Sequence, residues 1–139
     1  LTGAQSAVRR VISLLADGRP VLAHCFAGKD RTGFTVAVTL EAIGVDRDAV
    51  MADYLRSNQA VPQLRERILE SLRKRGDENT REIETFAEAR LAEEVLGVRD
   101  VYLHAALKTI DERYGSVSSY LEAIGITADQ VDRLRSALR

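Results

Sequence analysis

Cysteine is nearly absent from this chain of 139 residues, which contains only Cys25. A single cysteine cannot form an internal disulfide, and it cannot build a zinc–thiolate cluster. The two histidines, His24 and His104, show no metal-ligand spacing with acidic residues. We therefore expect neither a metal nor a cofactor, and the remaining question is whether Cys25 is a buried, inert thiol or a reactive one.

Long apolar runs and a strong charge of either sign are also lacking. No apolar run approaches the roughly 20 residues of a membrane span, and no signal peptide is visible. The net charge of -1 argues against nucleic-acid binding through general electrostatics. Hydrophobic residues make up 45% and charged residues 29%, as in an ordinary globular domain. Because the chain begins with Leu1 and not methionine, we expect its true beginning to lie upstream. Localisation therefore stays open between a cytoplasmic and a secreted protein.

The stretch Val21–Gly33, which reads VLAHCFAGKDRTG, organises the rest of the chain. A short apolar run after Arg19-Pro20 predicts a buried strand over 21–25, and a helical pattern begins at Arg31 or Thr32. This is the one convincing strand in the sequence, and one strand cannot satisfy its own ladder donors and acceptors. We expect its partner strands in an N-terminal part that this sequence lacks.

Apolar residues at helical spacing dominate the remainder, so the fragment itself is predicted to be mostly α with one strand. The helix after the turn is apolar nearly all round and should be buried. Capping residues and glycines set the other boundaries. The expected helices cover about 4–16, 31–43, a short segment after Asp46, about 62–75, about 81–94, 100–114, and two short segments after Ser116 and Thr127.

The turn after the strand brings together a thiol, a guanidinium and a run of backbone N–H groups. A free thiol has a pKa near ~8.5, so most of it is protonated at neutral pH. The helix N-terminus, the positive charges of Lys29 and Arg31, and a hydroxyl such as that of Thr32 would each lower the pKa of Cys25. Gly28 and Gly33 let the backbone curve tightly, so that successive N–H groups form an anion nest.

Such a nest would also bind a phosphoryl group. Arg31 can hold two of its oxygens, and Cys25 can attack phosphorus in line to give a cysteinyl-phosphate that water hydrolyses. Asp30 is the only acid within the turn and can protonate the leaving group. The alternative is a turn that binds a nucleotide phosphate or merely packs, but the glycine spacings typical of nucleotide loops are absent.

The loop H-C-x-x-G-K-D-R-T-G resembles that of bacterial tyrosine/phosphoinositide phosphatases. The likeness continues through nearly the whole chain, in TLEAIGVDRD, ADYLRSN, VPQLRERI, EARLAEEVLGVR and YGSVSSYLEAIGI. It covers only the C-terminal half of that family's length. The resemblance implies an α/β fold, with a central, mostly parallel sheet flanked by helices. Residues 1–139 would then be the C-terminal part of a single phosphatase domain, and the N-terminal half would supply the rest of the sheet.

The resemblance also assigns roles to individual residues. Cys25 is the nucleophile, Arg31 binds the phosphate, and Thr32 tunes the thiolate or the hydrolysis step. The general acid is either Asp30 or an aspartate of the N-terminal half. Lys29 occupies a position associated with phosphoinositide phosphatases, where an extra cation can meet a second phosphate. The phosphate-binding loop as a whole comprises Phe26, Ala27, Gly28, Lys29, Asp30, Thr32 and Gly33.

The resemblance further implies a helical lid over the active site, at about residues 64–96. Leu91 and Leu96 are the candidates for facing the pocket. The alternative is that the apolar stripe of this region simply packs on the body of the domain.

The function expected from these features is hydrolysis of phosphotyrosine through a cysteinyl-phosphate, without a metal. The substrate would be a phosphoprotein, with breadth to phosphoserine, phosphothreonine and phosphoinositides. The alternative is a phosphate-binding, catalytically incomplete fragment or a pseudophosphatase. Arsenate reduction would need resolving cysteines, which the sequence does not contain. Secretion by a bacterium is suggested by the resemblance alone.

Overall fold

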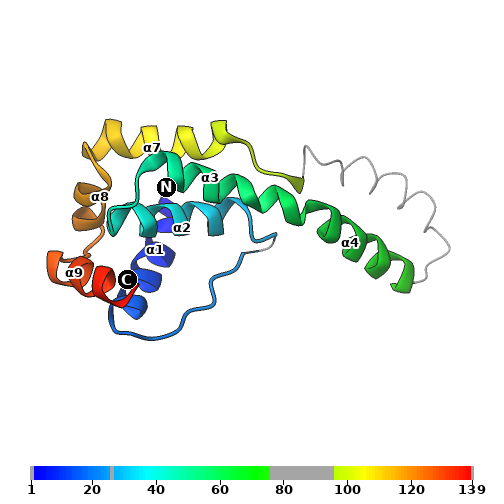
Figure 1. Cartoon of the computed structure of the whole chain (residues 1–139), viewed down its shortest axis with the longest axis horizontal. Helices are drawn as coiled ribbons and strands as arrows, with labels where there is room; N and C mark the ends of the chain where they lie inside the picture. Colours follow the sequence, from blue (N-terminus) through cyan, green and yellow to red (C-terminus); the bar gives the residue numbers. More distant parts are fainter. Residues whose placement is uncertain (1, 26, 76–95, 139) are drawn as a thin grey trace.

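The computed structural model describes residues 2–25, 27–75 and 96–138, and every regular element in these ranges is a helix (Figure 1). The elements are α1 (Thr2–Ala16), α2 (Asp30–Ala42), α3 (Arg47–Arg56), the 3₁₀ helix η1 (Ser57–Ala60), α4 (Val61–Arg75), α7 (Asp100–Tyr114), α8 (Val117–Ala123) and α9 (Ala128–Ala137).

The helix that follows the turn, α2, is the central element. It packs against α1, α3, α7 and α8. Its apolar side chains Phe34, Ala37 and Val38 are buried, as the all-round apolar pattern predicted. The buried hydroxyls of Thr35 and Thr39 donate to the carbonyls four residues earlier, at 2.9 and 2.8 Å. Because these hydroxyls are paired, α2 can be buried on most sides without leaving them unsatisfied.

The predicted helix starts are confirmed by side-chain caps. Asp46 accepts a hydrogen bond from the N–H of Ala49 at 2.9 Å. Ser116 accepts one from Ser119 at 3.1 Å. Thr127 forms a full capping box with Gln130. Helix α7 has the predicted bounds, whereas α2 begins at Asp30, slightly earlier than expected.

The prediction of a strand over 21–25 is wrong in this structure. Residues Val21–Cys25 have no regular secondary structure, and Leu22 is 89% exposed. A strand requires ladder hydrogen bonds to a neighbour, and the described residues provide no second strand. The apolar run alone therefore does not produce the element, and the central sheet remains a prediction.

The hydrophobic core lies where α1 packs against α9 and α2, and where α7 packs against α8. Its most completely buried members share zero exposure to solvent and come from five helices: Val8, Ile12, Val38, Ile110, Tyr120 and Leu134. At the other end of the molecule, α4 projects away from this body (Figure 1). The end of α2 that carries Asp30 and Arg31 thus lies between the packed core and the projecting α4.

The predicted lid region is described only in part. Helix α4 carries the half-buried Leu64, Ile68 and Leu69, and Leu96 is half-buried as well. Residues 76–95 lie outside the described residues, and Leu91 with them. Over the ranges that are described, no helix combines the length and hydropathy needed to cross a membrane.

Candidate active site

Two glycines shape the turn for different physical reasons. Gly28 has φ +67°, in the left-handed region where other residues are strained. Gly33 lies inside α2, where a Cβ would come within 2.6 and 2.7 Å of two ring carbons of Tyr54. Sequence reasoning had credited both glycines with the same backbone freedom, but Gly33 instead permits the close approach of α3 to the loop.

Cys25 lies at the end of the irregular segment, and its pKa is lowered from 9.0 to about 6. The largest cause is the hydroxyl of Thr32, and the backbone N–H groups of Thr32, Gly28 and Lys29 add to it, while partial burial acts in the opposite direction. The Thr32 hydroxyl is buried, and no described group forms a hydrogen bond with it that would compete with the thiolate. With such a pKa, most of Cys25 is ionised at pH 7 and nucleophilic.

Lys29 is engaged by a distant segment. Its Nζ donates to the carbonyl of Gly97 at 3.0 Å and lies 3.7 Å from Oδ2 of Asp30. Its side chain is only 19% exposed. The cation expected to meet a second phosphate is thus held by the chain just before α7.

Asn58 is a residue that sequence reasoning missed. Its side-chain amide donates to the carbonyl of Val98 at 3.0 Å and accepts from the N–H of Val98 at 2.7 Å. An asparagine near a helix end usually indicates a cap or a turn, so no local signal pointed to a partner 40 residues away.

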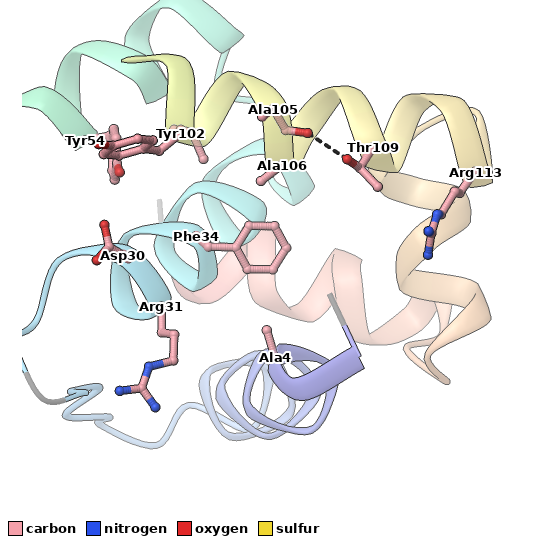
Figure 2. A pocket seen from close by; sticks show the side chains of 11 residues that line it. Ala4, Asp30, Arg31, Phe34, Tyr54, Tyr102, Ala105, Ala106, Thr109 and Arg113 are labelled. Carbon is pink, nitrogen blue, oxygen red and sulfur yellow. Dashed lines mark hydrogen bonds between the residues drawn. The ribbon is translucent and has the colours of Figure 1, made fainter. Parts of the chain in front are cut away.

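A cavity of about 500 Å³ opens beside the loop (Figure 2). Asp30 and Arg31 lie at one end of it and Arg113 at the other, with Phe34 and Ala106 between them. Apolar side chains make up most of its wall, and Arg31 provides a positive charge at the loop end. The space could therefore accept an aromatic or apolar group attached to a phosphate.

Tyr54 and Tyr102 line the same cavity above Asp30 (Figure 2). Burial raises the pKa of Tyr54 to about 12, and the charge of Asp30 and the neighbouring Tyr102 add to this effect. The Tyr54 hydroxyl consequently stays neutral at physiological pH. Neither tyrosine was singled out from the sequence as a site residue, because Tyr54 lies at helical spacing with core residues and Tyr102 lies off the apolar stripe of its helix.

A second cavity, of about 420 Å³, lies between α1 and the segment before the loop. Cys25, Arg31 and Thr32 line it together, with Arg10 of α1 opposite. Arg31 borders both cavities, whereas Cys25 borders only the second and Asp30 only the first. The structure thus brings the Cys25 thiol, the Arg31 guanidinium and the Thr32 hydroxyl to one cavity, and it places Asp30, the candidate acid, at the other cavity that Arg31 borders.

The remaining predicted site residues contribute less. His24, next to Cys25, is exposed, and its Nδ1 lies 3.4 Å from the carbonyl of Cys25. Leu96 lines neither of the two cavities. Phe26 lies outside the described residues. The part of the chain that is described holds no group of three or more potential metal ligands.

A sequence profile described as "Tyrosine phosphatase family" matches residues 1–139. The chain therefore belongs to the tyrosine phosphatase family, and the resemblance drawn from the loop is confirmed.

Individual relatives agree with this assignment. The chain is 60% identical over 137 residues to the triple specificity protein phosphatase PtpB of Mycobacterium tuberculosis, covering 98% of this chain and 50% of that protein. It is 39% identical over 104 residues to a putative tyrosine-protein phosphatase of Cupriavidus necator, covering 75% of this chain and 34% of that protein. A tyrosine-protein phosphatase of Nostoc commune is 30% identical over 121 residues, covering 85% of this chain and 38% of that protein. The chain thus spans half or less of the length of these relatives.

Proposed function

We propose that the protein containing this chain is a cysteine-dependent phosphatase that hydrolyses phosphotyrosine. The observation that carries the proposal is a cysteine of pKa about 6 in the same cavity as an arginine at the start of α2. A thiolate is the attacking form of cysteine, and a guanidinium is suited to bind two phosphate oxygens. Membership of the tyrosine phosphatase family supports the same activity.

The proposed reaction has two steps. The Cys25 sulfur attacks phosphorus, so that an S–P bond forms as the ester P–O bond breaks and the leaving oxygen takes a proton. Water then attacks the cysteinyl-phosphate, releasing inorganic phosphate and restoring the thiolate. In both steps, Arg31 and the N–H groups of the loop stabilise charge on the three equatorial oxygens. Thr32, beside the sulfur, favours its departure as a thiolate in the second step.

Asp30 is the general acid that the described residues offer, and an aspartate elsewhere in the whole protein is the alternative. Its carboxylate is 57% exposed and borders the cavity with the aromatic wall. Cys25 borders the other cavity, so a substrate held by Arg31 would have to extend from the cavity of Cys25 into that of Asp30. This arrangement would let Asp30 protonate a tyrosine leaving group.

The proposed fold of the whole protein is α/β, with a central sheet flanked by the helices seen here. Residues 1–139 would form the C-terminal part of that single domain, and about 64–96 would form a lid. The projection of α4 from the body supports a lid, and the half-length match to PtpB supports the domain assignment. The name of that relative, a triple specificity phosphatase, supports breadth to phosphoserine and phosphothreonine, and Lys29 in the loop supports phosphoinositides as further substrates.

The test is turnover of para-nitrophenyl phosphate and of a phosphotyrosine peptide by the whole protein, in the presence of EDTA. We expect Cys25→Ser to reduce turnover to background, because the nucleophile is lost. Rapid acid quenching of the wild type should trap a phosphoryl group on the peptide that contains Cys25. His104→Gln, on the exposed face of α7, is the matched control and should remain active. Full turnover by Cys25→Ser would refute the mechanism, and a wild type that binds phosphate without turnover would favour the catalytically incomplete alternative.

A further inference from the structure

A chain of hydrogen bonds connects η1 to the phosphate loop. Asn58 pairs with both backbone groups of Val98, at 2.7 and 3.0 Å. The adjacent residue, Gly97, accepts a hydrogen bond from Lys29 Nζ at 3.0 Å. Both Gly97 and Val98 are buried, so packing holds this support between the side chains of Asn58 and Lys29 in place.

Lys29 connects this support to the nucleophile. Its backbone N–H is one of the groups that stabilise the Cys25 thiolate, and its side chain is the group that Gly97 holds. Lys29 also directly precedes α2, with φ −110° and ψ −69°. The hydrogen bond at the ammonium end reduces the number of conformations open to Lys29, the residue whose N–H faces the sulfur.

We propose that Asn58 is a positioning residue for the phosphatase reaction proposed above: by holding Gly97 and Val98, it fixes Lys29 and, through Lys29, the phosphate loop around Cys25. Asn58 is itself exposed and takes no part in the hydrophobic core. Its partner is 40 residues away, so a role as a local cap does not account for its contacts. The Asn58 amide satisfies both the N–H and the carbonyl of Val98, which have no regular secondary structure to pair them.

Other charged groups near Cys25 would remain in place when Asn58 is changed. His24 adjoins it, Arg10 and Arg31 line its cavity, and Asp30 lies beyond Arg31. Within the described ranges, none of these side chains forms a hydrogen bond or an ion pair with Asn58 or with Val98. A change in the ionisation of Cys25 on replacing Asn58 would therefore report on the loop and not on these charges.

The first experiment measures the rate of Cys25 alkylation by iodoacetamide against pH, in the whole protein. We expect Asn58→Ala to raise the midpoint of this profile by about half a pH unit, because one of several N–H donors is no longer held at the sulfur. Gln59→Ala, also in η1 and exposed, is the matched control and should leave the midpoint unchanged. Melting temperatures of all variants establish whether they are folded.

Lys29→Met keeps the side-chain stem and the backbone N–H but removes the ammonium group. If Asn58 acts through Lys29, then Lys29→Met raises the midpoint by itself, and adding Asn58→Ala to it produces no further change. A merely structural role for Asn58 would instead give additive shifts. Because loss of the Lys29 charge by itself raises the midpoint, the comparison of Lys29→Met with the double variant carries the positive result. An unchanged midpoint in Lys29→Met would overturn the proposal even if Asn58→Ala does not fold.

The second experiment labels lysine amines with an acylating reagent and quantifies each by mass spectrometry. Lys29 is 19% exposed, whereas Lys74 and Lys108 are 74% and 73% exposed and serve as internal standards. We expect Asn58→Ala to increase labelling of Lys29 about fivefold relative to both standards, because a charge-assisted hydrogen bond is released. Unchanged labelling together with an unchanged midpoint would overturn the proposal. Neither measurement needs turnover, so an inactive wild type would refute the proposed function and leave this test intact.

Discussion

At the scale of single residues, the chemistry centres on how the Cys25 sulfur is kept ionised. Thr32 contributes most, ahead of the N–H groups of Gly28 and Lys29. Since the folded pKa lies below that of a free thiol, ionisation of Cys25 also stabilises the fold. This contribution is complete above the unfolded pKa of ~8.5 and is lost as the pH falls through about 6.

Replacing Thr32 with valine removes the hydroxyl and nearly preserves the shape. We expect Thr32→Val to raise the pKa of Cys25 from about 6 by at least one unit, because the largest stabilising interaction of the thiolate is lost. Alkylation at pH 7 should slow several-fold, while rates above about pH 9 should converge because the thiol is ionised in both proteins. Thr32→Ser retains a hydroxyl and should resemble the wild type. An unchanged midpoint in Thr32→Val would show that the backbone donors suffice.

At the scale of elements, the packing of α3 on α2 determines the geometry of the loop. The ring of Tyr54 occupies the space beside Gly33 that a side chain would need, and the same ring forms a wall of the cavity next to Asp30. Tyr54 is 5% exposed, so the ring cannot swing aside into solvent. A single aromatic residue thus joins helix packing to the shape of the candidate site.

Gly33→Ala should destabilise the protein by about 1–3 kcal/mol, because its methyl group would overlap the Tyr54 ring. In a Tyr54→Leu background the same substitution should cost much less, since the clash is removed. Gly3→Ala is the control, because Gly3 is also helical but has nothing within 4 Å of the added carbon. That change should be neutral or slightly stabilising, by up to ~1 kcal/mol. Urea unfolding measures the wild type and all four variants, and an equal cost of Gly33→Ala in both backgrounds would contradict this account.

At the scale of the whole molecule, one arginine links three helices through ion pairs. Arg47, at the start of α3, pairs through both ends of its guanidinium with Glu41 of α2 and with Asp111 of α7. Arg47 holds the pKa of the Asp111 carboxyl below its usual value, and the two carboxylates raise that of Arg47 in turn. This cluster lies at the end of α2 away from the phosphate loop, so it can stabilise the body without touching the site.

Arg47→Met should lower the free energy of unfolding by about 1 kcal/mol at pH 7, a modest loss because the pairs are partly exposed. The Asp111 contribution is present above the unfolded carboxyl pKa of ~3.9 and disappears as the pH falls through the lower folded value. The difference between wild type and variant should therefore shrink at pH 3 and in 1 M salt. Thermal unfolding at both pH values checks this. Arg56→Met is the control and should change the stability little, since Arg56 is 73% exposed and 4.0 Å from Asp53. If the stability lost in Arg47→Met persists at pH 3, then packing and not the ion pairs accounts for it.

The sequence by itself determined the features that depend on neighbouring residues. The caps at Asp46, Ser116 and Thr127 and the bounds of α7 were correctly predicted, because they follow from short-range hydrogen bonds and periodicity. The family followed from a contiguous motif and the comparisons confirmed it, whereas the roles of the loop residues stay predictions. Gly28 belongs with these features, since its positive φ is a local property of the turn.

Tertiary structure decided what depends on distant partners. The predicted strand over 21–25 did not form, because a strand exists only through a neighbour's ladder. The approach of Tyr54 to Gly33, the bond from Lys29 to Gly97 and the pairing of Asn58 with Val98 span 21 to 68 residues, and no local pattern encodes them. The division of the site into two cavities on either side of Arg31 has the same origin, because helices that are far apart in sequence form their walls.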